Sequence, residues 1–171
     1  MINIRPIVRV IGILLALLGA LMLLCIPFSL YYQAGDHMAL LYSGLLGIAL
    51  SGPILLLVKN AGNIKKREGY LIVALGWLTM VTYGALPYVF SGVIPNLTDA
   101  LFETVSGMTT TGASILIDIE STPKGILFWR SLTQWIGGMG IIVLTVAIFP
   151  LLGIGGVELF VAEAPGPTSD K

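Results

Sequence analysis

The stretch NLTDALFETVSGMTTTGASI, Asn96–Ile115, decides the fold, because it interrupts an apolar sequence with a pattern that no spanning helix has. Its first half, up to Gly107, predicts a helix of about 12 residues, or roughly 18 Å, which is about half of a membrane span. The second half holds three consecutive threonines, which disfavour a helix, and Gly112, which permits unusual backbone angles. The stretch therefore predicts a re-entrant pore helix followed by a filter loop, with an ordinary interfacial helix and loop as the alternative.

The composition is that of a membrane protein. Hydrophobic residues make up 56% of the chain and charged residues 11%, and the mean hydropathy is +0.95. Soluble domains carry roughly 25% charged residues. The single cysteine, Cys25, excludes a disulfide framework or a multi-thiolate metal site within one chain. His37 and Asp36 lie in a polar connector, which we interpret as a solvated loop between two helices rather than a metal or catalytic site.

Four apolar runs are long enough to cross a hydrocarbon core of about 30 Å. They are Val10–Tyr32, Ala39–Val58, about Tyr70–Phe90, and a run from near Lys124 to Val157. A signal peptide is the alternative for the first run, but the run is long and no clear small-residue cleavage site follows it. We therefore expect an all-α membrane protein with four transmembrane helices plus one re-entrant pore helix and filter loop. Pro27 is expected to kink or end the first helix.

The loop KNAGNIKKREG, Lys59–Gly69, sets the expected orientation, because basic residues collect on the cytoplasmic side of membranes. The same rule places Arg5 and Arg9 inside, so both termini are expected in the cytoplasm. A nucleic-acid-binding patch is the alternative, but a basic loop between two spans is better explained as a topology determinant. The outer face would then concentrate cations through its acidic residues Asp36, Asp99, Glu103, Asp118 and Glu120.

The filter loop offers what a dehydrated monovalent cation needs. Backbone carbonyls of Thr109, Thr110 and Thr111 can replace the water shell of the ion without adding net charge, and their hydroxyls can serve as further ligands or props. Gly112 permits the positive φ that aims successive carbonyls at one axis. The partly negative C-terminal end of the preceding helix also favours a cation at this place.

The surroundings of the filter hold two charged residues. Glu103 is expected either to hydrogen-bond the filter backbone or to face the outer vestibule, and Ala113 belongs to the same support or vestibule region. Arg130 is expected at the outer interface or snorkelling toward it, with pairing to an acidic group near the pore as the alternative. Glycines give the last predicted span a smooth face that suits close helix packing, namely Gly137, Gly138 and Gly140.

Three segments together resemble a known family: ALFETVSGMTTTGAS (Ala100–Ser114), FWRSLTQWIGGMGIIVL (Phe128–Leu144) and VAEAPGP (Val161–Pro167). They look like the beginning of a TrkH-type subunit of the Trk/Ktr/HKT superfamily of potassium transporters. The resemblance covers essentially the whole chain and is highly specific in the second half. In that family, a leading two-helix segment precedes four repeats of helix, pore loop and helix, which surround one pore.

The resemblance implies a division of the chain and a set of site residues. Residues 1–66 would be the leading pair with its basic cytoplasmic loop, residues 67–157 the first repeat, and residues 158–171 a cytoplasmic connector or tail. Thr110 and Thr111 would line potassium sites, with Thr109 and Gly112 beside them.

The function implied by the resemblance is potassium uptake across the bacterial inner membrane, down the electrochemical gradient or with coupling ions. Potassium would be the transported ion, without an organic cofactor. The implied partners are the lipid bilayer, the remaining repeats or other copies of the chain, and a cytosolic nucleotide-binding regulatory subunit. No nucleic acid partner is expected.

One repeat supplies one filter strand, whereas four strands are needed to surround an ion. We therefore interpret the chain as an N-terminal fragment of such a transporter, with a homotetramer as a second way to complete the pore. A non-conducting membrane assembly or scaffold protein, packed through its glycine-rich faces, is the alternative function. An enzyme is not expected, because no span carries a Ser/His, His/Glu or paired-Asp arrangement.

Overall fold

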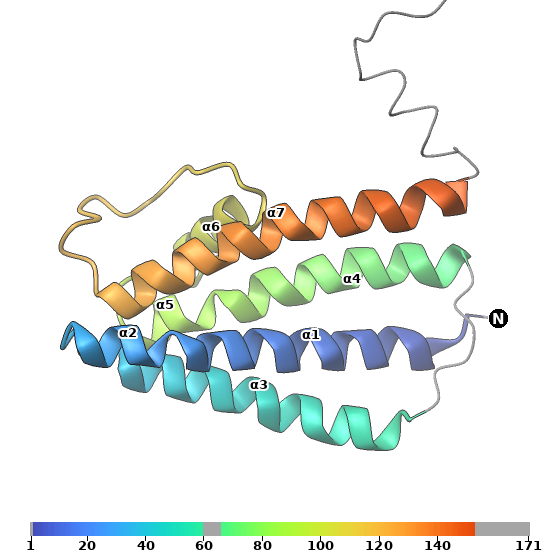
Figure 1. The fold of residues 1–171 in the computed structure, drawn as a ribbon, viewed down its shortest axis with the longest axis horizontal. Coiled ribbons are helices and arrows are strands. Elements are labelled where there is room, and N and C mark those ends of the chain that lie inside the picture. Colours follow the sequence, from blue (N-terminus) through green and yellow to red (C-terminus); the bar gives the residue numbers. More distant parts are fainter. Residues whose placement is uncertain (1, 60–65, 153–171) are drawn as a thin grey trace, which may run out of the picture. The chain divides into compact units, whose positions relative to one another are not determined.

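The computed structural model describes residues 2–59 and 66–152, and the secondary structure of this part is helical (Figure 1). The helices are α1 (Ile4–Leu24), α2 (Ile26–Tyr31), α3 (His37–Leu57), α4 (Lys66–Gly84), α5 (Leu86–Phe90), α6 (Leu97–Met108) and α7 (Lys124–Leu152). The chain forms two compact units, Met1–Gly138 and Met139–Lys171. The first unit holds α1 to α6 and the first part of α7. In the second, the described residues continue α7.

Three stretches of the described residues are long and apolar enough to cross a membrane. They are Ile4–Tyr31, which joins α1 to α2, His37–Leu57, which is α3, and Arg67–Phe90, which joins α4 to α5. These stretches have 28, 21 and 24 residues and match the first three predicted spans. The described part of the fourth predicted span lies in α7, whose 29 residues rise about 43 Å at 1.5 Å per residue, but α7 is not among these three stretches.

Some predictions concern residues outside the described part. These are residues 60–65 of the basic loop, the predicted end of the fourth span at 153–157, and the tail 158–171.

Proline divides two of the spans into a long and a short helix. α1 ends at Leu24 and α2 begins at Ile26, with Pro27 in the first turn of α2, as the sequence predicts. Pro87 lies in the same position of α5, directly after the end of α4. A proline inside a helix removes one backbone donor and clashes with the preceding turn, so the helix is interrupted there. The shorter segments α2 and α5 can therefore take a different direction from the helices before them.

Close backbone contacts hold α1 against α3. A Cβ atom on Gly19 would lie 2.7 Å from the carbonyl oxygen of Gly44, and one on Gly44 would lie 2.9 Å from that of Gly19. Small residues at such crossings let helices approach in a membrane, where no hydrophobic force drives them together. The Tyr83 hydroxyl of α4 donates a hydrogen bond to the backbone carbonyl of Ser43, which attaches α4 to the same pair.

The expected solvated loop at Asp36 and His37 is wrong for Asp36. Its side chain is buried, with 5% of the residue exposed, and the carboxylate accepts hydrogen bonds from the Ile126 backbone N–H and the Ser29 hydroxyl. The physical reason is distant in sequence: the first turn of α7 has unpaired N–H groups, and this carboxylate satisfies one of them.

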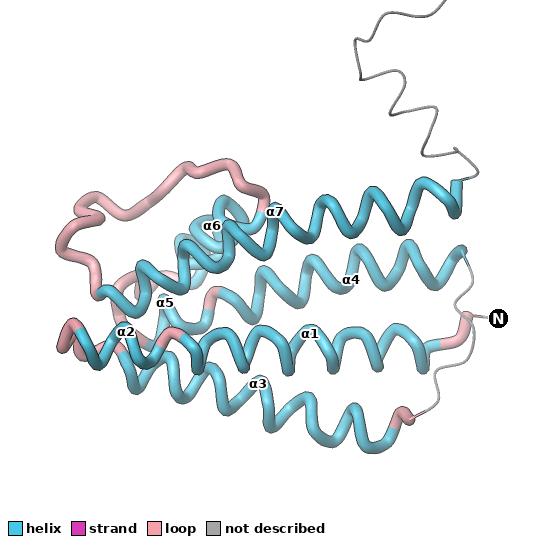
Figure 2. The backbone as a smooth tube through the Cα atoms, viewed as in Figure 1, coloured by secondary structure: helices cyan, strands magenta, loops and turns pink. Residues whose placement is uncertain are grey.

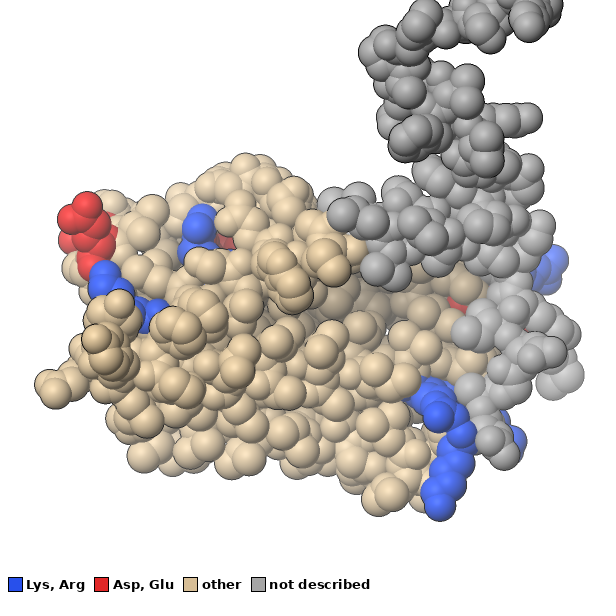
Figure 3. Space-filling view, in the orientation of Figure 1, with Lys and Arg blue, Asp and Glu red and all other residues tan. Residues whose placement is uncertain are grey.

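Charged side chains gather near the two ends of the first unit. Figure 3 shows Lys and Arg side chains at the end where α1 begins and α3 ends, and the largest group of acidic side chains at the opposite end, with basic side chains beside it. At the basic end, the Arg9 guanidinium donates a hydrogen bond to the Lys59 backbone carbonyl. At the opposite end, a long loop leads from α6 to α7, drawn in pink in Figure 2. This loop contains the predicted filter.

Candidate ion-filter site

The predicted half-length helix is confirmed as α6, which has 12 residues and is about 18 Å long. Asn96 is its N-cap, and the Asn96 side-chain oxygen accepts a hydrogen bond from the Thr98 backbone N–H at 3.0 Å. Asp99 lies in the first turn, where a negative charge is favourable. The helix ends at Met108, and the backbone leaves the helical path at the threonines.

The backbone turns sharply within the predicted filter. Gly112 has a φ of +79°, as its residue type predicts, and Thr110 has a φ of +58°. A β-branched residue rarely adopts a positive φ, so the backbone at Thr110 is strained. The N–H groups of Thr111 and Gly112 both point back to the carbonyl oxygen of Ser106, at 3.0 and 3.5 Å.

The backbone carbonyl oxygens of this turn accept no hydrogen bond within the described part of the chain. Within residues 2–59 and 66–152, no group donates a hydrogen bond to the carbonyl oxygens of Thr110, Thr111 or Gly112. These three residues are also exposed. Because the N–H groups of Thr111 and Gly112 bond inward, the open side of the turn presents oxygen atoms, which is the polarity that a cation requires.

The threonine hydroxyls form a short directed chain. The Thr109 hydroxyl donates to the Val105 carbonyl oxygen at 2.8 Å and lies 2.8 Å from the Thr111 hydroxyl. A hydroxyl has one proton, so the Thr111 hydroxyl must be the donor in the second bond. The hydroxyl group of Thr111 is thereby oriented by α6.

A buried carboxylate connects α6 to the strand that follows the filter. Glu103 is fully buried, and its carboxylate accepts hydrogen bonds from the Ile115 backbone N–H at 2.8 Å and from the Ser114 hydroxyl at 3.1 and 3.2 Å. Of the two positions considered for Glu103, the structure shows the one bonded to the backbone. Ala113 is held as well, because the Ser106 hydroxyl donates to its carbonyl oxygen.

Arg130 completes this network: of the two positions considered for it, the structure shows the one paired with an acidic group. Its Nε atom is 2.5 Å from Glu103 Oε1, and only 18% of the Arg130 side chain is exposed. The physical reason is that an unpaired buried charge is costly, and pairing lets the fully buried Glu103 carboxylate keep its charge. The pair joins α7 to α6, the helix that precedes the predicted filter.

Residues of α7 back the filter at further points. A Cβ atom on Gly107 would lie 2.5 Å from Thr133 Oγ1, and one on Gly137 would overlap the backbone carbonyl of Met108. The predicted smooth glycine face is therefore confirmed at Gly137, which lets α7 reach the backbone of α6. Gly138 lies next to the filter, since its Cβ would be 3.8 Å from Thr110 Cγ2.

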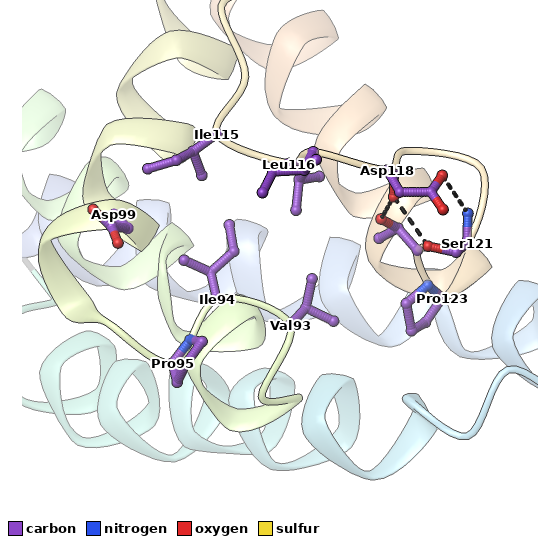
Figure 4. Close-up of a pocket in the computed structure, with 11 residues that line it drawn as sticks. Val93, Ile94, Pro95, Asp99, Ile115, Leu116, Asp118, Ser121 and Pro123 are labelled. Atoms are coloured by element: carbon purple, nitrogen blue, oxygen red, sulfur yellow. Dashed lines mark hydrogen bonds between the residues drawn. The ribbon is translucent and has the colours of Figure 1, made fainter.

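A cavity of about 550 Å³ lies beside the strand that follows the filter (Figure 4). Its walls come from the turn between α5 and α6 and from residues 115–123, and Asp99 and Asp118 lie at opposite ends of it. Ser121 holds the pKa of Asp118 below its ordinary value through its side chain and through its backbone N–H, which donates to Oδ1 of Asp118 at 3.2 Å, while its hydroxyl also donates to the Asp118 backbone carbonyl at 3.3 Å. Asp118 is therefore charged at neutral pH and adds a negative potential near the loop.

The interpretation of the sequence missed the hydrogen bonds of Ser106 and Ser114 and the packing of Thr133 against Gly107. A signal was available for part of the network, because Glu103 and Arg130 are isolated charges in two segments predicted to be embedded in the membrane. Two such charges in one small unit are expected to pair. No comparable signal marks Ser106, whose hydroxyl could equally bond to its own helix, or Ser114, which follows the helix.

Comparison with known proteins gives the same family as the three sequence segments. A protein-family model described as TrkH, cation transport protein, matches residues 36–171. The Trk system potassium uptake protein TrkH of Salmonella typhimurium is 46% identical over 171 residues, which cover 98% of this chain and 35% of that protein. The Trk system potassium uptake protein TrkG of Escherichia coli is 36% identical over 98% of this chain and 35% of its own length.

The fold has a counterpart among solved structures. The crystal structure of the potassium transporter TrkH from Vibrio parahaemolyticus matches with a TM-score of 0.83 and 39% identity, over 91% of this chain and 34% of that chain. The present chain spans about a third of the length of the curated relatives it matches. The resemblance stated from the three sequence segments is confirmed, and the matching proteins are transporters rather than enzymes.

Proposed function

This chain belongs to the TrkH family of cation transport proteins, and from that premise we propose that it supplies one filter strand to a pathway for potassium uptake across the bacterial inner membrane. Thr110 and Thr111 contribute potassium ligands, and Thr109 and Gly112 shape the strand. The observation that carries this proposal is the polarity of the turn, because inward N–H groups leave the carbonyl oxygens of Thr110, Thr111 and Gly112 without a donor among the described residues.

The proposed topology has four spans and one re-entrant segment. α7 forms the fourth span, α6 enters the membrane from outside, and both termini lie in the cytoplasm. Support comes from the length of α7, from the half-span length of α6, and from the basic residues Arg9 and Lys59 meeting at one end of the first unit. Residues 1–66 then form the leading pair, 67–157 the first repeat, and 158–171 a cytoplasmic connector.

One strand cannot surround an ion, so further strands must complete the filter. We propose that they come from the remaining repeats of a longer TrkH-like protein, or from other copies of the chain. Support for the first source is that the chain spans 35% of the length of its relatives. A cytosolic nucleotide-binding regulatory subunit is the proposed partner on the inner side, by resemblance to the family.

The test is potassium uptake by a bacterial strain that lacks its own uptake systems and expresses the full-length product of this gene. Gly112→Ala is compared with Gly92→Ala, because both glycines have a positive φ, +79° and +69°, and no close neighbour limits either of them. Both substitutions strain the backbone by about 1–2 kcal/mol, but only Gly112 lies in the proposed filter.

We expect growth at low potassium to be lost in Gly112→Ala and retained in Gly92→Ala, at equal amounts of protein in the membrane. Equal growth of the two variants would contradict the assignment of the filter. A wild-type protein that is abundant in the membrane but takes up no potassium would favour the non-conducting assembly protein.

A further inference from the structure

The buried carboxylate of Asp36 acts on a helix far away in the sequence. It lies in the connector between α2 and α3, and it accepts the backbone N–H of Ile126, 90 residues later, at 2.7 Å. Ile126 is the third residue of α7, so this bond satisfies one of the free N–H groups at the start of that helix. A negative charge at this place is also favoured by the helix dipole.

The local sequence does not supply this cap. Pro123 occupies the N-cap position of α7 and has no side chain that accepts a hydrogen bond. The neighbouring Thr122 hydroxyl donates to the Asp118 carbonyl oxygen at 2.9 Å. Asp36 therefore takes a role that most helices give to a residue of their own chain segment.

Close packing also supports the contact between Asp36 and the start of α7. A Cβ atom on Gly125 would lie 2.7 and 2.9 Å from the two carboxylate oxygens of Asp36, so a larger residue would push the carboxylate away. The rings of Phe28, on α2, and Phe128, on α7, stack with their centroids 3.8 Å apart and their planes 18° from parallel. These contacts join the start of α7 to the end of the first span, and Figure 1 shows the start of α7 beside α2 at this end of the unit.

The helix held in this way is the one that backs the filter. One turn after Ile126, about 6 Å along the axis, Arg130 binds Glu103, whose carboxylate accepts the Ile115 N–H. Another turn on, Thr133 packs against Gly107. A shift or rotation of α7 at its start would therefore move the residues on both sides of the filter turn: Gly107 before the turn, through Thr133, and Ile115 after it, through Arg130 and Glu103.

We infer that Asp36 is a positioning residue for ion selection: it sets the position of α7, and through α7 the geometry of the filter strand. The leading helix pair thereby takes part in selectivity rather than serving as a membrane anchor alone. This inference rests on the proposed function of the Thr110–Gly112 turn.

A second buried carboxylate provides a matched control. Glu68, with 2% of the residue exposed, accepts the Asn3 backbone N–H at 2.8 Å and so joins the start of α4 to the start of α1. Like Asp36, it connects the leading pair to the following helices through a backbone N–H at a helix start. Its bond to the Asn3 N–H involves neither α6 nor α7. Glu68→Ala therefore measures the effect of losing a buried carboxylate on the stability of the unit, without a direct effect on the filter.

The experiment uses the full-length gene product in lipid vesicles, with variants Asp36→Ala, Asp36→Asn and Glu68→Ala. Two readouts are measured: the ratio of potassium to sodium uptake rates, and hydrogen exchange of the segment 109–116. For Asp36→Ala we expect the ratio to fall about tenfold, the equivalent of one charge-assisted hydrogen bond, and the exchange of the segment to speed up. Asp36→Asn keeps an acceptor oxygen and should recover much of both, whereas Glu68→Ala should leave both near wild type.

Other outcomes overturn the inference. If Asp36→Ala lowers only the amount of folded protein, with ratio and exchange unchanged, Asp36 is a structural residue and nothing more. The same conclusion follows if Glu68→Ala changes both readouts as much as Asp36→Ala. If the wild-type protein transports no potassium, the proposed function fails, and the exchange data alone then decide whether Asp36 positions the segment.

Discussion

Replacing Arg130 with methionine removes the counter-charge of a fully buried carboxylate while keeping a side chain of similar length. Glu103 would retain two donors, the Ser114 hydroxyl and the Ile115 N–H. Breaking a buried ion pair by removing one partner costs about 3–5 kcal/mol. Because the two remaining donors still stabilise the carboxylate, we expect a loss near the lower end, about 3 kcal/mol. For a protein of 150–250 residues this corresponds to a fall in melting temperature of about 6–12 °C.

The assay is thermal unfolding of the purified protein in detergent, for Arg130→Met, for Glu103→Gln and for the double variant. The double variant replaces the ion pair by two neutral groups, so it should lose about 2 kcal/mol less than the sum of the single losses. A melting temperature that falls by less than about 2 °C in Arg130→Met, or single losses that simply add, would refute the assignment of Glu103 and Arg130 as a buried pair.

Two further predictions concern neighbouring positions. Gly137→Ala should destabilise the protein by about 3 kcal/mol in the same unfolding assay, because the new methyl group would overlap the Met108 carbonyl, whereas Gly138→Ala has room and should be neutral or slightly stabilising. A large loss in both variants would contradict this. Ser121→Ala should raise the pKa of Asp118 toward its ordinary value, observed by NMR titration of labelled aspartate. Since the folded pKa is depressed, the stabilisation by Asp118 is present above its unfolded pKa and is lost as the pH falls through the folded value. An unchanged titration curve would show that the Ser121 side chain does not lower the pKa of Asp118, since the backbone N–H of residue 121 remains in the variant.

The half-length helix and the turn after it could be predicted because their signals are local. The Asn96 cap, the 12 apolar and polar residues of α6 and the glycine at position 112 each act within a few residues of themselves. The positive φ of Thr110 could not be predicted, because β-branched residues avoid it. It arises from the return of two N–H groups to the Ser106 carbonyl, which overrides the preference of the side chain.

The partners of the long-range bonds could not be identified from a single sequence. Asp36 looks like a connector residue until α7 is placed beside it, 90 residues later. Arg130 could be expected to pair, but its residue type is equally consistent with a side chain that reaches the interface. In both cases the sequence shows a charged side chain that requires a partner, but only the packing of the helices determines which group that partner is.

The strained backbone at Thr110 has a consequence for how this protein fails. A left-handed φ at a β-branched residue costs of order 1–3 kcal/mol, which must be offset by its surroundings. The offsetting bonds reach Thr111 and Gly112 from a single carbonyl group, that of Ser106. Relaxation of that one peptide would release both bonds together and let the turn extend. Under heat or mutation, we therefore expect this loop to open before the helices separate, so that the proposed filter loses its shape while the protein is still folded.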